Sequence, residues 1–179
     1  MIKKFLKLKN IILIGPPAVG KTSVGLAISN RLSKSFYDID EYIVSHQKLT
    51  VDEIFVQYGE AYFRNLESEA ILNLSKLNDI VLATGGGAIL NSTNRNVLTN
   101  SGAVVYLYAK GEVLYRRILQ QNNRPKFKNL LGDKLKLEIQ HTLEVRDNIY
   151  NSIADVKINI TNLTIEEVVI KILNYLIKL

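Results

Sequence analysis

One eight-residue segment near the start of the chain constrains the fold more than any other. Residues 15–22 read GPPAVGKT and match the pattern G-x-x-x-x-G-K-[ST]. They follow the apolar run Ile11–Ile14 and precede a helical pattern that begins at Lys21. In that setting, backbone N–H groups at the helix N-terminus face phosphate oxygens, and the helix dipole favours negative charge. The segment therefore predicts a nucleoside triphosphate site, with a chance glycine turn before a helix as the alternative.

Each residue type in this segment, the phosphate loop, has a physical role in that prediction. Gly15 and Gly20 allow the backbone to turn and to approach a ligand closely. Lys21 is expected to reach the β- and γ-phosphates, and Thr22 is expected to supply a hydroxyl ligand to Mg²⁺. The predicted ATP contacts in this part of the chain are Gly15, Pro16, Pro17, Ala18, Val19, Gly20, Lys21, Thr22 and Ser23.

Apolar runs of strand length alternate with amphipathic helical stretches along the chain. The predicted strands are Ile11–Ile14, a short one around Phe36–Tyr37, Ile80–Ala83, Ala103–Tyr108 and Val156–Ile160. One predicted helix begins at Lys21, and three more cover about 60–77, 112–121 and 133–150. A last predicted helix follows Thr164. Three of the strands are nearly continuous in apolar character, as expected for strands covered on both faces. The alternation predicts an α/β fold with a parallel sheet between helices.

Two helix starts carry a capping box, in which a Thr oxygen and a Glu three residues later satisfy free backbone N–H groups. These pairs are Thr50 with Glu53 and Thr164 with Glu167. They predict helices that begin immediately after Thr50 and Thr164.

Composition limits the class of protein. The 179 residues fit one domain, and 47% apolar residues are enough for a full core. The absence of cysteine excludes disulfides and thiolate metal sites. The net charge of +6 is carried by scattered lysines without interleaved stacking aromatics, which argues against nucleic-acid binding. An anionic nucleotide and an anionic acceptor account for the surplus positive charge. No apolar run approaches a membrane span of ~18 residues, so we expect a cytoplasmic protein without membrane contact.

Two acidic residues follow the second predicted strand. Asp38 and Asp40 stand in FYDIDEYI, one residue apart. Alternate residues of a strand point to the same side, so Asp38 is expected to face a metal and Asp40 the acceptor. A carboxylate that accepts the proton of an attacking hydroxyl is what a small-molecule kinase needs. The alternative is a helix N-cap and a solvated acid.

An arginine and a glutamate form the next candidate pair. Arg64 and Glu67, in FRNLESE, are three residues apart on a predicted helix and are therefore neighbours. One interpretation is a guanidinium that Glu67 holds and offers to a substrate carboxylate. The other is a surface ion pair of little energetic value.

Three consecutive glycines end the third predicted strand. Gly85, Gly86 and Gly87 lie where ligands of open α/β sheets bind, at the carboxyl end of a strand. Glycine costs backbone entropy, so a run of three is reasonable where a ligand must approach the main chain. A flexible surface turn is the alternative.

The polar stretch 120–133, QQNNRPKFKNLLGD, is the least periodic part of the chain. A loop of this length inside a compact domain is usually functional, and a disordered insertion is the alternative. Arg124 within it is a candidate lid arginine for the transferring phosphoryl group. Arg146, late in the fourth helix, is a candidate second carboxylate contact. Either arginine can instead be an ordinary solvated charge.

In order and at these spacings, the segments GPPAVGKT, FYDID, FRNLE, ATGGGA, RP and RDNIYNSIAD resemble those of shikimate kinase. The likeness runs from about Lys9 to the last helix. The phosphate loop alone does not separate this family from gluconate, adenylate or other small kinases. The combination of Asp-x-Asp, Phe-Arg-x-x-Glu and triple glycine is much more specific.

The resemblance implies a three-layer P-loop fold of the nucleoside-monophosphate-kinase type, with a five-stranded parallel sheet in the order 2-3-1-4-5. It implies a single kinase domain over 1–179, with an acceptor-binding region at about 38–67 and a lid at about 120–133. The implied reaction is ATP plus shikimate giving ADP plus shikimate 3-phosphate, on the route to chorismate and the aromatic amino acids. A monomer is expected.

The resemblance also assigns roles to the candidate residues. Asp40 holds the acceptor hydroxyls and serves as base, and Asp38 binds Mg²⁺ through water beside Thr22. Arg64, oriented by Glu67, and Arg146 clamp the shikimate carboxylate. The remaining assignments are Lys21 and Arg124 as catalytic cations, Arg117 against adenine, and Gly85, Gly86 and Gly87 in the acceptor pocket.

A few positions depart from the family pattern. Ala18 replaces a usual loop glycine, which predicts a slightly stiffer phosphate loop whose single methyl group does not block phosphate. Lys126 and Phe127 follow Arg-Pro where two leucines are usual, so the contact between lid and acceptor is an open point. Two rivals remain: a gluconate-type kinase, and a nucleotide-binding module without catalysis. Against the second, Lys21, Thr22 and Asp40 are all present.

Overall fold

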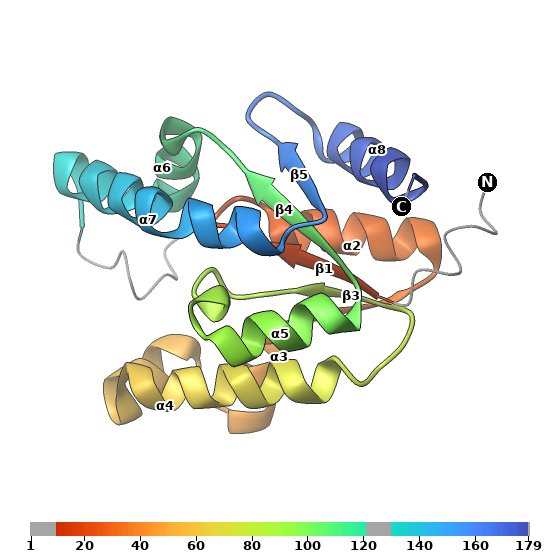
Figure 1. The fold of residues 1–179 in the computed structure, drawn as a ribbon. Coiled ribbons are helices and arrows are strands. Elements are labelled where there is room, and N and C mark those ends of the chain that lie inside the picture. Colours follow the sequence, from red (N-terminus) through yellow and green to blue (C-terminus); the bar gives the residue numbers. More distant parts are fainter. Residues whose placement is uncertain (1–9, 121–129, 179) are drawn as a thin grey trace.

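A computed structural model of the chain describes residues 10–120 and 130–178. Five parallel strands form one sheet in the order β2-β3-β1-β4-β5, as predicted (Figure 1). The strands are β1 Asn10–Ile14, β2 Ser35–Asp38, β3 Ile80–Ala83, β4 Ala103–Tyr108 and β5 Val156–Asn159. The last strand ends one residue before the predicted boundary.

The position of β1 in the middle of the sheet explains why its sequence is almost entirely apolar. Ile12 is in register with Leu82 of β3 on one side and Val104 of β4 on the other. All five residues of β1 are buried, because helices cover both faces of the sheet. Ile11 and Leu13 belong to one core cluster, whereas Ile12 and Ile14 belong to the other. Strand alternation therefore divides the core into two layers.

The helices complete a three-layer arrangement (Figure 1). α2 (Lys21–Leu32) and α8 (Ile165–Leu176) contact each other and cover one face. α4 (Val51–Leu74) and α5 (Ser92–Ser101) contact each other and contribute to the core on the opposite face. The other elements are α3 (Ile39–Gln47), the 3₁₀ turn η1 (Ala88–Leu90), α6 (Gly111–Leu119) and α7 (Gly132–Ile153). The predicted α/β class is confirmed.

Both predicted capping boxes are present. Thr50 Oγ1 accepts from the N–H of Glu53 at 3.2 Å, while the Glu53 carboxylate accepts from the N–H of Thr50 at 2.7 Å. Thr164 and Glu167 make the same reciprocal pair at the start of α8.

Two helical predictions were incomplete. The segment predicted as 60–77 is the second part of α4, which begins at Val51 and changes direction at Gly59, where φ is +82°. α5 was not predicted, because only Asn94 and Leu98 of its ten residues are buried and its apolar periodicity is weak. Its start is stabilised by Asn91, whose side chain accepts from the N–H of Thr93.

The end of α3 offers a test of backbone strain. Lys48 is exposed and adopts the left-handed conformation, with φ +58° and ψ +22°. Because a Cβ atom is disfavoured there, we expect Lys48→Gly to raise the free energy of unfolding by roughly 1 kcal/mol. Urea unfolding measures the change. Lys48→Ala is the matched control, since it removes the side chain and keeps the strain; an equal gain in both variants would contradict this explanation.

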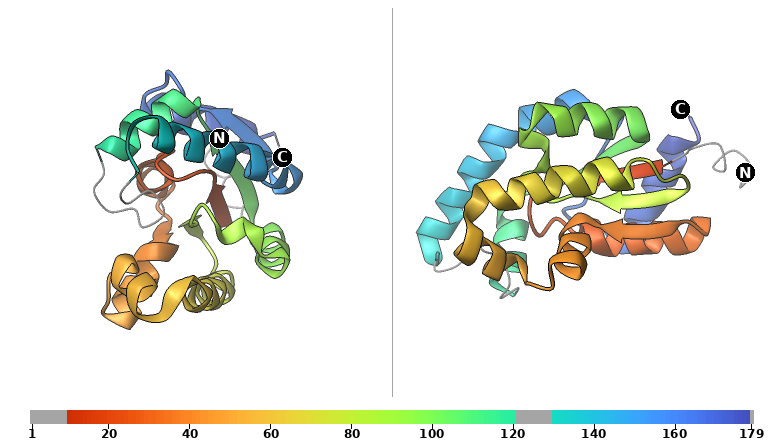
Figure 2. Two further views of the ribbon diagram at one scale, coloured as in Figure 1. Left: turned by 90° about the vertical axis from the view of Figure 1, so that its left-hand side faces the viewer. Right: turned by 90° about the horizontal axis from the view of Figure 1, so that it is seen from below.

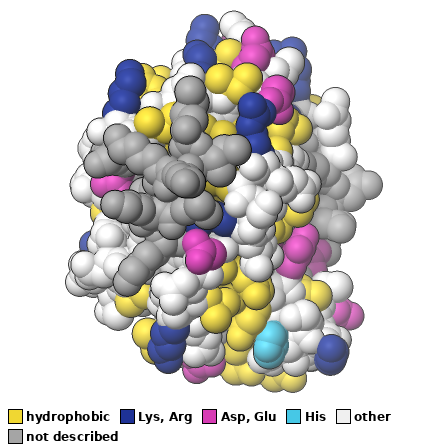
Figure 3. Space-filling view, turned by 90° about the vertical axis from the view of Figure 1, so that its right-hand side faces the viewer, with side chains coloured by type: hydrophobic (Ala, Val, Ile, Leu, Met, Phe, Trp, Pro, Cys, Tyr) yellow, Lys and Arg dark blue, Asp and Glu magenta, His cyan; other side chains and the backbone are white. Residues whose placement is uncertain are grey.

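α3 and α4 pack against each other beside the sheet, and Figure 2 shows them from two further directions. This pair carries most of the region predicted to bind the acceptor, residues 38–67. Residues 121–129 of the predicted lid lie outside the described residues. On the face in Figure 3, basic side chains are dispersed rather than gathered in one patch. Within 10–120 and 130–178, no helix combines the length and apolar character needed to cross a membrane.

Candidate active site

The phosphate loop has the strained backbone that its glycines predict. Gly15 and Gly20 have φ values of +144° and +103°, which favour glycine. A Cβ atom on Gly15 would collide with the carbonyl oxygen of Leu107, so the loop lies directly against the end of β4. Lys21 donates from Nζ to the carbonyl oxygens of Gly15 and Pro16, both at 2.8 Å. The Lys21 ammonium group therefore contacts the phosphate loop itself, where a phosphate is expected to bind.

Ala18 adopts the left-handed conformation, with φ +61°. A glycine would accept this conformation without strain, whereas the methyl group of Ala18 restricts the loop, in line with the expected stiffness. Ala18 is only 4% exposed and packs in a core cluster with Val19 and Val24. Ala18 is therefore almost fully enclosed by the protein.

Asp38 caps a helix, as one of the two interpretations expects, and it also contacts the phosphate loop. Its Oδ1 accepts from the backbone N–H of Asp40 at 3.0 Å and so caps α3. Its Oδ2 accepts from Thr22 Oγ1 at 2.7 Å. The cap fixes the carboxylate beside the phosphate loop, and this leaves a hydroxyl and a carboxylate in contact. Two hard oxygen ligands next to a phosphate site fit Mg²⁺, which keeps several waters and uses few protein ligands.

Within the part of the chain that the structure describes, no three Asp, Glu, His or Cys side chains gather as a metal cluster. A magnesium ion here would depend on Thr22, Asp38, water and the nucleotide phosphates.

Arg64 lies between two glutamates on α4. It donates from Nη1 to Glu67 Oε2 at 2.9 Å and from Nη2 to Glu60 Oε1 at 2.9 Å. Glu67 is 1% exposed, whereas Glu60 is exposed at 65%. The ion pair between Arg64 and Glu67 therefore involves a buried carboxylate. Only the pair between Arg64 and Glu60 is a surface ion pair.

Burial raises the pKa of the Glu67 carboxyl, although Arg64 opposes this shift and the Asp40 carboxylate adds to it. Burial also acts to lower the pKa of Arg64, but the carboxylates of Glu67 and Glu60 outweigh that effect and raise it. The arginine stays charged, and its charge favours the ionised form of Glu67, against the effect of burial.

The three glycines lie against different parts of this site. A Cβ atom on Gly85 would sit 3.3 Å from Asp40 Oδ1 and would collide with Glu67 Oε1. One on Gly87 would lie 2.7 Å from both terminal nitrogens of Arg64. Glycine is required at these positions because the backbone lies close to Asp40, Glu67 and Arg64. This packing does not fit a flexible surface turn.

Gly86 connects the acceptor residues to the phosphate loop. A Cβ atom on Gly86 would be 2.8 Å from Cδ of Pro17. Its carbonyl oxygen accepts from Arg146 Nη1 at 2.9 Å, and Arg146 is 8% exposed. The structure therefore brings Asp40, Arg64 and Arg146 to one glycine segment next to the loop.

Arg117 of α6 lies beside the phosphate loop. Its Nη1 donates to the carbonyl oxygens of Val19 at 2.9 Å and Ala18 at 3.4 Å. A cavity of about 260 Å³ opens next to this contact. Its lining comes from the phosphate loop, α2, Arg117 and the segment after β5: Ala18, Val19, Gly20, Ser23, Val24, Arg117, Ile160, Leu163, Ile165 and Val168. The cavity adjoins Arg117, the residue that the sequence analysis expects against adenine.

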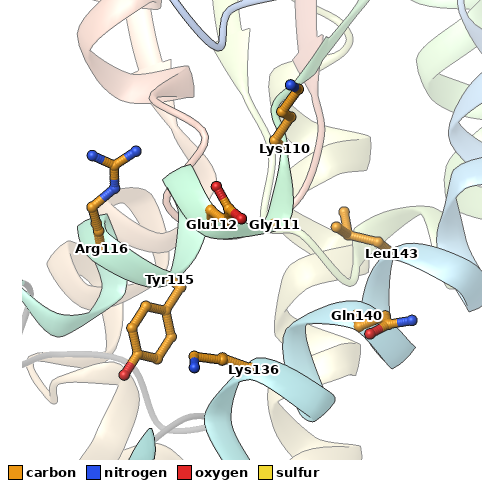
Figure 4. Close-up of a pocket in the computed structure, with 8 residues that line it drawn as sticks. All are labelled: Lys110, Gly111, Glu112, Tyr115, Arg116, Lys136, Gln140 and Leu143. Carbon is orange, nitrogen blue, oxygen red and sulfur yellow. The ribbon is translucent and has the colours of Figure 1, made fainter. Parts of the chain in front are cut away.

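A larger cavity of about 680 Å³ lies between α6 and α7 (Figure 4). Tyr115, Lys136 and Leu143 are among the side chains around it. None of the predicted site residues within the described ranges lines it. Arg124, Lys126 and Phe127 lie outside the described residues, so the prediction for Arg124 stays a prediction.

Comparison with known proteins agrees with this geometry. A family model described as shikimate kinase matches residues 17–177. A shikimate kinase of Thermoanaerobacter pseudethanolicus is 37% identical over 96% of this chain and 98% of its own length. The chain belongs to the shikimate kinase family. Family membership makes it an ATP-dependent kinase, a transferase that binds nucleotide.

Solved structures extend the comparison to the fold. A shikimate kinase from Acinetobacter baumannii, determined in complex with shikimate, has a TM-score of 0.92 and 34% identity, covering 99% of this chain and 98% of its own. A gluconokinase from Sinorhizobium meliloti has a TM-score of 0.58 at 20% identity, covering 95% of this chain and 92% of its own. The second likeness shows a shared fold alone. The comparisons thus favour the shikimate kinase family over the gluconate-type alternative.

The sequence patterns did not predict three residues at the site. Tyr150 donates to the Gly86 carbonyl from the same helix as Arg146, and its only signal was its position four residues later. Ile160 and Leu163 line the cavity beside Arg117, and their signal was their place at the end of a predicted strand and just after it. Ligands of open α/β sheets bind at such carboxyl ends, so that signal was available.

Proposed function

We propose that the chain transfers the γ-phosphoryl group of ATP to the 3-hydroxyl of shikimate, giving shikimate 3-phosphate and ADP, in the biosynthesis of chorismate and the aromatic amino acids. The observation that carries this proposal is the meeting of Asp40, Arg64 and Arg146 around Gly85–Gly87, directly against Pro17 of the phosphate loop.

Two arginines suit a planar carboxylate. A guanidinium presents N–H groups in a fixed fork that matches carboxylate geometry. Arg64 is held by Glu67, and Arg146 is held by the Gly86 carbonyl. Side chains that are fixed before binding lose less entropy when the acceptor arrives, so they align it for attack.

Asp40 is the proposed base. It lies in the first turn of α3, next to Gly85, and Asp38 fixes the backbone there. A carboxylate within reach of the acceptor hydroxyl orients it and takes its proton as the phosphoryl group is transferred.

Cations on the nucleotide side complete the proposal. Lys21 is proposed to reach the β- and γ-phosphates, and Arg117 borders the cavity proposed for the base. Arg124, which lies outside the described residues, is proposed as the lid arginine for the transferring group. Thr22, with Asp38 acting through water, would hold Mg²⁺, which neutralises phosphate charge. We also propose one kinase domain, a monomer, and a cytoplasmic location without nucleic-acid or membrane partners.

Release of ADP with different acceptors tests the function. With ATP and Mg²⁺, we expect release with shikimate and none above background with gluconate. Methyl shikimate, which keeps the hydroxyls and lacks the charged carboxylate, should have a kcat/KM lower by ~10²-fold or more, because the charge-assisted pairs are lost. Shikimate binding without ADP release would instead support a non-catalytic module.

A further inference from the structure

The Gly86 carbonyl oxygen accepts two hydrogen bonds from one helix. Arg146 Nη1 donates at 2.9 Å and the Tyr150 hydroxyl at 2.5 Å. The two donors are four residues apart on α7 and therefore lie on the same face of the helix. A carbonyl oxygen has two lone pairs, so both bonds form together. The hydroxyl and the guanidinium thus share one anchor.

The Tyr150 ring is held in place by its contact with a tyrosine of the sheet. Tyr150 is 0% exposed and stacks on Tyr106 of β4, with ring centroids 4.8 Å apart. The Tyr106 hydroxyl donates to Asp147 on α7 at 2.7 Å. Burial raises the pKa of the Tyr150 hydroxyl, although Arg146 opposes the shift, so the group stays a proton donor. The position of its oxygen is set by the sheet.

The bound carbonyl belongs to a segment with little freedom of its own. Gly86 lies against Pro17, while Gly85 borders Asp40 and Gly87 borders Arg64. A rotation of the Gly86 peptide would move an anchor of Arg146 and shift the glycines beside Asp40 and Arg64. A donor that restrains this carbonyl therefore affects the acceptor side of the site more than the nucleotide side.

We propose that Tyr150 is a positioning residue of the acceptor site: its hydroxyl fixes the Gly86 carbonyl and thereby sets the direction of the Arg146 guanidinium. The inference rests on the proposed function, in which Arg146 binds the acceptor carboxylate. Tyr150 need not touch the acceptor. Its effect is transmitted through the shared carbonyl oxygen, and the aromatic ring only places the hydroxyl.

Tyr150→Phe removes the hydroxyl and keeps the ring. We expect the KM for shikimate to rise by about 3- to 10-fold, as for one hydrogen bond, with the KM for ATP changed less than about twofold. The matched control is Tyr106→Phe, which removes the hydroxyl of the stacked partner and loosens the same helix without touching Gly86. It should leave both KM values unchanged, with a comparable loss in thermal stability.

A double-mutant cycle separates positioning from packing. On an Arg146→Ala background, the effect of Tyr150→Phe on the KM for shikimate should shrink to less than about twofold, because the group it directs is gone. An effect of undiminished size on that background would overturn the inference. So would equal acceptor KM values in the two Phe variants, or a Tyr150→Phe protein that fails to fold while Tyr106→Phe folds.

Failure of this inference is distinguishable from failure of the proposed function. A wild-type protein that releases no ADP with shikimate, or an Arg146→Ala variant with an unchanged acceptor KM, would overturn the function or its clamp. An active wild type and an impaired Arg146→Ala variant, together with an unaffected Tyr150→Phe variant, would overturn the role of Tyr150 alone.

Discussion

Asp40→Asn is expected to lower kcat by ~10³-fold or more, while the affinity for ATP stays within about twofold of the wild type. Asn keeps the size and hydrogen-bonding capacity of the side chain, but it cannot take up a proton from the acceptor hydroxyl. Nucleotide affinity should persist because the phosphate loop and Arg117 are unchanged. Steady-state kinetics with shikimate measure kcat, and titration with ATP in the absence of shikimate measures the nucleotide affinity.

The control for Asp40→Asn is Glu41→Gln. Glu41 is an exposed acid in the same first turn of α3, so its replacement removes one negative charge from the same helix N-terminus. It should leave kcat within about twofold of the wild type, since exposed charges near a helix terminus act mainly on stability. An Asp40→Asn enzyme with most of its kcat would remove Asp40 from the mechanism.

Arg64→Ala should reduce kcat/KM for shikimate by ~10²-fold or more, mainly through a higher KM, because a charge-assisted contact with the acceptor carboxylate is lost. The KM for ATP should change little. The substitution also leaves Glu67 buried without the arginine, which costs stability. The double variant Arg64→Ala/Glu67→Gln removes that buried charge and should lose as much acceptor kcat/KM as the single variant.

Arg31→Ala is the matched control for Arg64→Ala. Arg31 forms an ion pair with Glu166, and both side chains are substantially exposed, at 49% and 63%. This pair has the surface character that the alternative interpretation gave to Arg64 and Glu67, and its loss should leave the kinetics unchanged. If Arg64→Ala behaves like Arg31→Ala, Arg64 has no part in acceptor binding.

The central strands were predictable because burial on both faces leaves a clear trace in the sequence, whereas the sheet order followed from the resemblance to a known family. β1, β3 and β4 are almost entirely buried and appear as continuous apolar runs. The starts of α4 and α8 were predictable from their Thr-Glu capping boxes. α5 left no comparable trace, because few of its residues are buried and its N-cap, Asn91, is not part of a capping box.

Within the site, local pairs were easier to predict than distant ones. Arg64 and Glu67 are neighbours on any helix, so their contact followed from spacing. Of the two interpretations of Asp38, the helix cap is confirmed, since Oδ1 accepts from the N–H of Asp40. The metal role stays a prediction, next to the contact between Oδ2 and Thr22.

The contact of Arg146 and Tyr150 with Gly86 spans at least sixty positions and depends on how α7 crosses the sheet. Periodicity cannot supply such information, because it describes which face of an element is buried and not what that face meets.

A crystal structure with shikimate and ADP bound would test the account most directly. It should place the shikimate carboxylate within hydrogen-bond distance of both Arg64 and Arg146, and the 3-hydroxyl beside Asp40, facing the phosphate loop. A carboxylate bound away from the two arginines, or a 3-hydroxyl turned away from Asp40, would contradict it.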